Sequence, residues 1–321
     1  RELCGEYQRW VLMKRHKDSF KQRLAVGNPR AAENFDEKLT KVLHDVDSNY
    51  SRYFTHDATA RFTWTNLEEI VRQTATVLKE TVSTDELKTL LTESSFGLSK
   101  SELGNFSVDD IYLRGRIDRL DQLSTDYLGA IDYKSSAHSF KLQEAYDGLS
   151  LQFMTYLDVI KQAFPNQKIW GALYLQFKNQ PINLSEINQL SEIANILKES
   201  MRYEGLVLED AAEQIKGIEN IALKKTNIYN EEEFEQLLKL NEEHYRAAGQ
   251  RLKKGKIAIN PIMKRSEGID QSGNVRGCRY CPLKSICRFE ANIHMNEHSR
   301  EIGQKSQAEI LAELKGEERD E

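Results

Sequence analysis

Cysteine is scarce in this chain. Four cysteines occur in 321 residues, with Cys278, Cys281 and Cys287 close together and Cys4 at the opposite end. Small secreted domains that are held by disulfides carry many more cysteines, spread along the chain. The pattern therefore excludes a disulfide framework and leaves one tight group of thiols to be explained.

Long apolar runs are also missing. No stretch reaches the roughly 18 uninterrupted apolar residues that a membrane-spanning helix needs. The first residues, beginning at Arg1, contain no Met and lack the charged-then-apolar pattern of a secretion signal. We therefore expect a cytoplasmic protein with no membrane partner, and a chain excised from a longer one.

Positive charge is not in excess. Lys and Arg number 45 against 50 Asp and Glu, which gives a net charge of -5. This balance excludes a protein that coats nucleic acid by bulk electrostatics, but a local basic groove stays open. Six arginines are candidates, either as a solvated face or as contacts to a DNA backbone: Arg114, Arg116, Arg119, Arg276, Arg279 and Arg288.

The composition is that of a globular protein with room for a sizeable core. Hydrophobic residues make up 39% and charged residues 30%, with a mean hydropathy of -0.62. Three parts are expected along the chain. They are a helical lobe at 1–90 that carries the first cysteine, an α/β core at 91–260, and a cysteine segment with a fraying polar tail at 261–321.

Alternation and periodicity predict the elements of the core. Residues 110–120 and 127–134 alternate as two strands of a hairpin, and the apolar run 168–177 is typical of a buried strand. Helical spacing predicts four helices, which we place at 66–81, 142–164, 185–199 and 231–253.

The candidate chemistry lies on the hairpin. Asp132 and Lys134 are two residues apart on a strand, so their side chains project from the same face. The preceding strand carries Asp118, which the hairpin can bring beside Asp132. Two adjacent carboxylates repel each other unless a cation neutralises them, and such oxygen ligands suit Mg²⁺ or Mn²⁺. An ion of this kind can activate water, while Lys134 orients it or stabilises negative charge, as phosphodiester hydrolysis requires.

These residues resemble a known signature. The sequences GRIDR at 115–119 and IDYKSS at 131–136 are similar to the D…(D/E)-x-K pattern of the PD-(D/E)xK nuclease superfamily, in its RecB-like branch. Gln152 and Tyr156, on one helix face, resemble the Gln-x-x-x-Tyr helix of that branch. The resemblance implies a nuclease core with a mixed central sheet flanked by helices. It also implies two sets of site residues: Asp118, Asp132, Lys134, Gln152 and Tyr156 as catalytic, and Asp118, Asp132 and Tyr133 as metal ligands.

The cysteine segment resembles that of one family within this superfamily. The spacing C-x₂-C-x₅-C at 278–287 is similar to that of the AddB/RexB family, the nuclease-bearing subunits of AddAB-type helicase-nucleases. In that family a distant upstream cysteine completes a [4Fe–4S] cluster, and Cys4 stands at the matching place. Four thiolates also satisfy zinc, and the spacing alone does not choose between the two. We expect the cluster to be structural and to join the two ends of the chain.

The resemblance to this family implies a function for the chain. We expect a Mg²⁺-dependent exonuclease domain that cuts one DNA strand as the strand emerges from an AddA/RexA-like helicase-nuclease partner. The two subunits would form a heterodimer that acts in recombinational repair of double-strand breaks. No nucleotide-binding motor is visible, because the nearest match to a phosphate loop, at 249–257, has the wrong spacing and lacks the final Ser or Thr.

One departure from the family pattern keeps alternatives open. RecB-like nucleases usually add an upstream metal-binding histidine, and His16, His44 and His56 are the candidates, unless the ligand is absent. Glu93 stands where the family often has a glutamate, in a role that the sequence does not define. The alternative functions are a catalytically silent nuclease-fold module that serves as a structural, DNA-binding part of a larger complex, and a free-standing exonuclease of the same superfamily.

Overall fold

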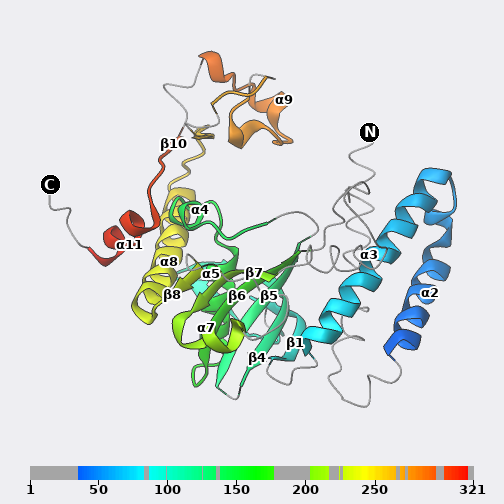
Figure 1. Ribbon diagram of the computed structural model, residues 1–321. Helices are drawn as coiled ribbons and strands as arrows, with labels where there is room; N and C mark the ends of the chain where they lie inside the picture. The colour runs from blue at the N-terminus through cyan, green and yellow to red at the C-terminus, as the bar shows by residue number, and fades with distance from the viewer. Residues whose placement is uncertain are drawn as a thin grey trace, which may run out of the picture. The chain divides into compact units, whose positions relative to one another are not determined.

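The computed structural model (Figure 1) describes residues 35–82, 87–98, 100–124, 126–134, 138–176, 203–216, 224, 227–264, 268–271, 274–293 and 300–316. The chain divides into two compact units. The first comprises 1–107, 112–140 and 152–234, and the second comprises 108–111, 141–151 and 235–321. Each unit is described by itself.

A six-stranded sheet forms the centre of the first unit. Its order is β1-β4-β5-β6-β7-β8. The pairs β5–β6 and β7–β8 are parallel and the others are antiparallel, so the sheet is mixed, as the sequence resemblance implied. The strands are β1 (Leu87–Phe96), β4 (Gly115–Leu123), β5 (Tyr127–Lys134), β6 (Lys168–Gln176), β7 (Tyr203–Leu208) and β8 (Ile228–Tyr229).

The hairpin that carries the candidate chemistry is confirmed. Strands β4 and β5 pair antiparallel up to Leu123 and Tyr127, and Ser124 at the turn has a φ of 53°. The predicted strand 127–134 matches β5. The predicted strand 110–120 is in fact β3 (Ile111–Leu113), which pairs with β2 (Phe106–Val108), followed by β4.

The single helix predicted over 142–164 is wrong. The structure has α4 (Leu142–Tyr146) and α5 (Gln152–Ala163) with a break between them. Gly148 has a φ of 73°, and the amides of Gly148 and Leu149 donate to Ala145 and Glu144, respectively. These bonds satisfy the last carbonyls of α4 and end the helix, because glycine adopts the left-handed conformation without steric cost.

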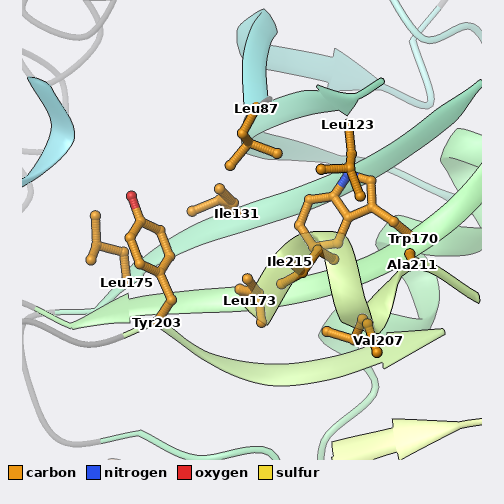
Figure 2. Packing of buried hydrophobic residues seen from close by; sticks show 11 residues of the cluster. Leu87, Leu123, Ile131, Trp170, Leu173, Leu175, Tyr203, Val207, Ala211 and Ile215 are labelled. Atoms are coloured by element: carbon orange, nitrogen blue, oxygen red, sulfur yellow. The ribbon is translucent and has the colours of Figure 1, made fainter. Parts of the chain in front are cut away.

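One face of the sheet carries the main core cluster. Figure 2 shows Ile131, Leu173 and Val207, from three adjacent strands, packed with Ala211 and Ile215 of α7 (Glu209–Lys216). Trp170 lies in the same cluster, and its indole N–H donates to the carbonyl of Asp121 at 3.0 Å. Side chains alternate along a strand, so Asp132, next to Ile131, projects from the opposite face.

Helix α5 covers that opposite face. Phe153 stacks on Tyr174 of β6 with 3.9 Å between ring centroids, and Phe140 stacks on Phe153. Most of α5 is buried, including the polar residues Thr155 and Asp158. The layer under α7 is therefore mainly apolar and the layer under α5 is mixed, and the side chains of Asp118, Asp132 and Lys134 lie on the α5 face.

Two long helices precede the sheet. α2 (Phe35–Phe54) and α3 (Ala58–Val82) pack through Leu39, Leu43 and Ala75. The prediction placed a helix at 66–81, but α3 begins eight residues earlier (66 minus 58). The reason is a cap: the Asp57 carboxylate accepts a hydrogen bond from the Ala60 amide at 2.7 Å, as N-cap residues do.

The edge strand β1 was not predicted. It begins at Leu87, within the stretch that the sequence assigned to the helical lobe at 1–90, and it pairs antiparallel with β4. Its register shifts between Thr89 and Leu91, and Glu93 has a φ of 53°. The strand is therefore irregular, which weakens the simple alternation that would have revealed it.

Helix α8 (Glu231–Lys253) follows the predicted bounds. Asn230 and Glu233 form a reciprocal cap, in which each side chain accepts from the other's amide. Acidic residues in the first turn and Arg251 and Lys253 in the last complement the helix dipole. The helix predicted at 185–199 lies outside the described residues.

The second unit contains the cysteine segment and the C-terminal helix. β9 (Ile262–Lys264) pairs parallel with β10 (Arg300–Ile302), and the cysteines lie near the short helices η4 (Arg276–Cys278) and α9 (Lys284–Cys287). The fraying expected of the tail is wrong for α11 (Gln307–Lys315). Ser306 and Glu309 form a complete capping box, and Ile310 is buried. Within the described ranges, no helix combines the length and apolar character that crossing a bilayer requires.

The packing under α7 predicts where stability resides. Leu173→Ala removes a fully buried side chain and should lower the free energy of unfolding by about 2–5 kcal/mol. Leu90→Ala, on β1, is the matched control, because 46% of Leu90 is exposed. Denaturant titration of both variants checks the expectation. Equal midpoints for the two would contradict the assignment of the core to this face.

Candidate active site

The two aspartates of the hairpin stand side by side. The β4–β5 ladder runs as far as the pair of Arg119 with Ile131, and the next step places Asp118 opposite Asp132. The Asp118 Oδ2 atom accepts a hydrogen bond from the Tyr133 amide at 3.0 Å. The convergence that the sequence predicted is therefore present, and a main-chain contact between the strands holds it.

Lys134 contacts Asp132 directly. Its Nζ lies 2.7 Å from Asp132 Oδ2 and donates to Gln152 Oε1 at 2.9 Å. The Asp132 side chain is 5% exposed and that of Lys134 is 21% exposed. The carboxylate is thus enclosed, while the ammonium group reaches the edge of the site.

Helix α5 adds the amide and the phenol. Gln152 Nε2 donates to Asp132 Oδ1 at 2.8 Å and to the Tyr156 hydroxyl at 2.7 Å, and that hydroxyl lies 3.4 Å from Asp132 Oδ1. Burial, together with the negative charge of Asp132, raises the pKa of Tyr156 above its ordinary value. The phenol therefore keeps its proton and donates to the carboxylate. The structure brings together all five residues that the sequence assigned to catalysis.

Aromatic rings pack against the side chains of Lys134 and Tyr156. Lys134 Nζ lies 5.2 Å from the centroid of the Tyr174 ring, a cation–π arrangement. His138 meets the same ring edge-on at 5.5 Å, and Phe96 meets Tyr156 edge-on at 6.5 Å. These rings limit the freedom of the Lys134 and Tyr156 side chains.

The donor set suits a divalent cation of the hard type. Asp118 and Asp132 offer carboxylate oxygens, and Mg²⁺ commonly binds proteins through one or two carboxylates while it keeps several waters. Among the described residues, no group of three or more His, Cys, Asp or Glu side chains could hold a metal ion. The fit to such an ion rests on the two carboxylates of Asp118 and Asp132.

The comparison with family models decides the class of fold. The model of the PD-(D/E)XK nuclease superfamily matches residues 12–288, which is most of the chain and includes every residue of the network. The chain belongs to the PD-(D/E)XK nuclease superfamily. The matched range includes the six-stranded sheet and the residues Asp118, Asp132 and Lys134.

Similar proteins are subunits of helicase-nucleases. The chain is 97% identical over 291 residues to the exonuclease/helicase subunit RexB of Lactococcus lactis subsp. cremoris, a match that covers 91% of this chain and 26% of that protein. It is 32% identical over 273 residues to a subunit of the ATP-dependent helicase/deoxyribonuclease of Streptococcus pyogenes, a match that covers 84% of this chain and 24% of that protein. The chain therefore spans about a quarter of the length of the curated relatives it matches.

Arg119 lies in a different environment from the one that the sequence predicted. The sequence included it among arginines that are solvated or contact DNA, but its side chain is 3% exposed and pairs with Asp121, which is fully buried. Arg119 Nε lies 2.7 Å and 2.9 Å from the two Asp121 oxygens, and Nη2 also bonds Asp121. Arg276 and Arg279 also form ion pairs within the protein, with Glu144 and Asp270.

The buried pair reaches the second strand through Tyr133. Arg119 Nη1 donates to the Tyr133 hydroxyl at 3.4 Å, on the face opposite Asp132. Burial opposes the charge of Arg119, but Asp121, Tyr133 and Tyr203 favour it, and the pKa of Arg119 rises above its ordinary value. The guanidinium is thus always charged. Sequence reasoning missed this network, although Arg119 continues the buried face of Ile117 at a spacing of two residues.

The candidate histidines do not join the carboxylates. His44 is exposed on α2, and His56 is exposed and lies 2.7 Å from Asp57. His16 lies outside the described residues. Within the described part of the chain, neither His44 nor His56 joins the carboxylates.

Glu93 occupies a third place beside the aspartates. Its neighbours on β1, Thr92 and Ser94, pair with Arg119 and Ile117 of β4. Glu93 is therefore opposite Asp118, and β4 separates it from β5. Its side chain is 8% exposed and lies 3.4 Å from Arg116. The sequence left its role undefined. The structure adds a buried acidic side chain on the strand next to the catalytic hairpin.

The described cysteines carry free thiols. Cys278, Cys281 and Cys287 form no disulfide. Burial raises the pKa of the Cys278 thiol, and the nearby Cys287 and Cys281 raise it further. Among the described residues, these cysteines do not belong to any group of three or more His, Cys, Asp or Glu side chains that could hold a metal ion. Cys4 lies outside those residues.

The buried ion pair generates a stability prediction. Asp121→Asn leaves the Arg119 guanidinium buried without its counter-charge and should lower the free energy of unfolding by about 3–5 kcal/mol. Asp109→Asn is the matched control, since Asp109 is 52% exposed in its ion pair with Arg246, and such pairs contribute little. Thermal and denaturant unfolding check both variants. A stability of Asp121→Asn equal to that of the control would contradict the role of the pair.

Proposed function

We propose that this chain is a Mg²⁺- or Mn²⁺-dependent deoxyribonuclease domain that hydrolyses phosphodiester bonds in one DNA strand. One observation carries the proposal: Lys134, Gln152 and Tyr156 all converge on Asp132, next to Asp118. A lysine beside paired carboxylates combines a cation-binding centre with a donor for water or for a phosphate oxygen. Membership of the nuclease superfamily supports the same chemistry.

Each residue has a defined task in this proposal. Asp118 and Asp132 would hold the ion, together with the main-chain carbonyl of Tyr133, because the phenol of Tyr133 is engaged by Arg119 on the opposite face. The bound ion lowers the pKa of water and neutralises charge on the phosphate. Lys134 orients the attacking water and stabilises the negative charge that develops as the bond from phosphorus to the leaving oxygen breaks.

Gln152 and Tyr156 act on the orientation of Asp132. Both donate to Oδ1, so the carboxylate cannot rotate without losing two hydrogen bonds. A fixed carboxylate lowers the cost of organising the site when the substrate arrives. Their support therefore keeps Asp132 in place beside Lys134.

The wider process is proposed from the relatives. Their names describe subunits of helicase/deoxyribonucleases, and this chain matches about a quarter of their length. We assign to it the exonuclease step of an AddAB/RexAB-like enzyme in the bacterial cytoplasm. There it would degrade a single strand delivered by an AddA/RexA-like partner in a heterodimer, during end resection in recombinational repair.

A structural [4Fe–4S] cluster is part of the proposal. Cys278, Cys281 and Cys287 would hold it together with Cys4, and zinc is the alternative occupant. The close sequence spacing of Cys278, Cys281 and Cys287, whose thiols form no disulfide, supports a common ligand. The task of the cluster is to tie the distant ends of the chain together.

Cleavage of end-labelled single-stranded DNA tests the nuclease. Asp132→Asn and Lys134→Gln should each lower the rate about 10²-fold or more with Mg²⁺, because each removes a group that stabilises the transition state. EDTA should abolish cleavage by the unmodified chain. Asp126→Asn, an exposed aspartate just before the same hairpin strand, is the matched control and should cleave normally.

Two results would contradict parts of this proposal. Full cleavage by a folded Lys134→Gln variant would remove Lys134 from the mechanism. A folded, unmodified chain that binds DNA but leaves it intact with Mg²⁺ and with Mn²⁺ would favour the second candidate, a catalytically silent nuclease-fold module. That candidate draws support from the two histidines that lie away from the carboxylates.

The cluster has its own test. Protein purified without oxygen should contain iron and acid-labile sulfide in nearly equal amounts and absorb visible light, and Cys281→Ser should lose both and unfold at a lower temperature. Zinc without sulfide would assign the site to zinc. Neither metal, in a folded chain with an unchanged melting temperature in Cys281→Ser, would contradict a structural cluster.

A further inference from the structure

Three exposed side chains precede Asp118 at alternate positions. Tyr112, on β3, is 79% exposed, Arg114, between β3 and β4, is exposed, and the side chain of Arg116, on β4, is 49% exposed. At positions between them, Leu113 is half-buried and Ile117 is fully buried. Because side chains alternate along a strand, Arg116 shares the face of Asp118 on β4. Arg114 and Tyr112 continue the same pattern of exposure, and the three residues form a row that ends at Asp118.

The row is positively charged, whereas the chain as a whole has a negative net charge. Arg114 forms no hydrogen bond or ion pair with any described residue, and Arg116 pairs with Glu93 at 3.4 Å. Two guanidinium groups thus stand next to an acidic centre in a chain whose net charge is -5. Arginine presents a planar set of donors that matches phosphate oxygens, so this local excess suits a phosphate backbone.

Tyr112 adds a surface of another kind. A single exposed aromatic ring is common on proteins and carries little meaning alone. Here the ring continues a row of two arginines at the same sequence spacing of two residues. Basic side chains and aromatic rings in alternation are the usual means of binding single-stranded nucleic acid, because the rings stack on unpaired bases.

We propose that Tyr112, Arg114 and Arg116 form the path of a single DNA strand into the site. Arg116 and Arg114 contact successive phosphates on the approach to Asp118, and Tyr112 stacks on the outermost base. The path deepens the proposed function and rests on it, since it delivers the strand that Asp118 and Asp132 act on. A duplex does not fit this assignment, because its paired bases expose no free face to Tyr112.

Binding measured without cleavage tests the path. Fluorescence anisotropy of a labelled oligothymidylate is followed with Mg²⁺ in an Asp132→Asn background, which separates binding from catalysis. Arg114→Gln should weaken binding and reduce the slope of log affinity against log salt by about 0.7, one phosphate contact. Tyr112→Ala should weaken binding roughly 5- to 150-fold with an unchanged slope, and Tyr112→Phe should restore it.

Arg61→Gln is the matched control. Arg61 is an exposed arginine on α3 that forms no side-chain ion pair with the described residues, so its loss should leave affinity and salt slope unchanged. Thermal melts confirm that each variant is folded. In the catalytically intact background, Arg114→Gln should raise KM for the oligonucleotide and leave kcat within about twofold, because it affects binding alone.

The outcomes separate the path from the nuclease. If Arg114→Gln and Tyr112→Ala bind like Arg61→Gln while cleavage still requires Asp132, the path is wrong and the proposed function stands. If the unmodified chain neither binds nor cleaves single-stranded DNA, both the path and the proposed function are wrong. An equal loss of binding for Arg114→Gln and Arg61→Gln also contradicts the path, since it indicates attraction by overall charge.

Discussion

The ion pair of Arg119 and Asp121 is the constraint on which the site depends. Both side chains are buried on the sheet face opposite the catalytic carboxylates. A buried guanidinium is tolerated only with its counter-charge, so Arg119 cannot leave this position without a large cost. Asp118 precedes Arg119 directly and must then face the other way, and Tyr133, bonded to Arg119, fixes Asp132 and Lys134 in the same manner.

Each strand of the hairpin therefore has two sides. On β4, Asp118 lies on the face of the candidate site and Arg119 anchors the other face, while on β5 Tyr133 is the anchor between Asp132 and Lys134. The amide of Tyr133 bonds Asp118, so the anchor of one strand also positions the carboxylate of the other. The alternation of a β-strand makes this division of labour available at neighbouring positions. Helix α5 then completes the site from the functional face through Gln152 and Tyr156.

Much of this arrangement could be predicted from the sequence, and the exceptions have physical causes. The hairpin, β6 and α8 follow regular patterns of alternation or helical spacing. The pattern of the hairpin is enough to place Asp118 beside Asp132. Strand β1 escaped because a register shift and the left-handed Glu93 disturb its alternation. The break between α4 and α5 depends on the backbone of Gly148, and Arg119 was misassigned because charge was weighed above its place on a buried face.

The acidic balance of the chain bears on how DNA could reach such a site. Glu93, Asp118 and Asp132 concentrate negative charge on three adjacent strands, which repels a phosphate backbone unless cations intervene. A divalent ion would neutralise the carboxylates, and Arg114 and Arg116 add positive charge on the approach. Affinity for a single strand should then depend jointly on the ion and on the arginine row. In the proposed function, neither bulk charge nor the sheet alone supplies that attraction, so recognition would depend on Arg114 and Arg116, which precede Asp118 in the chain.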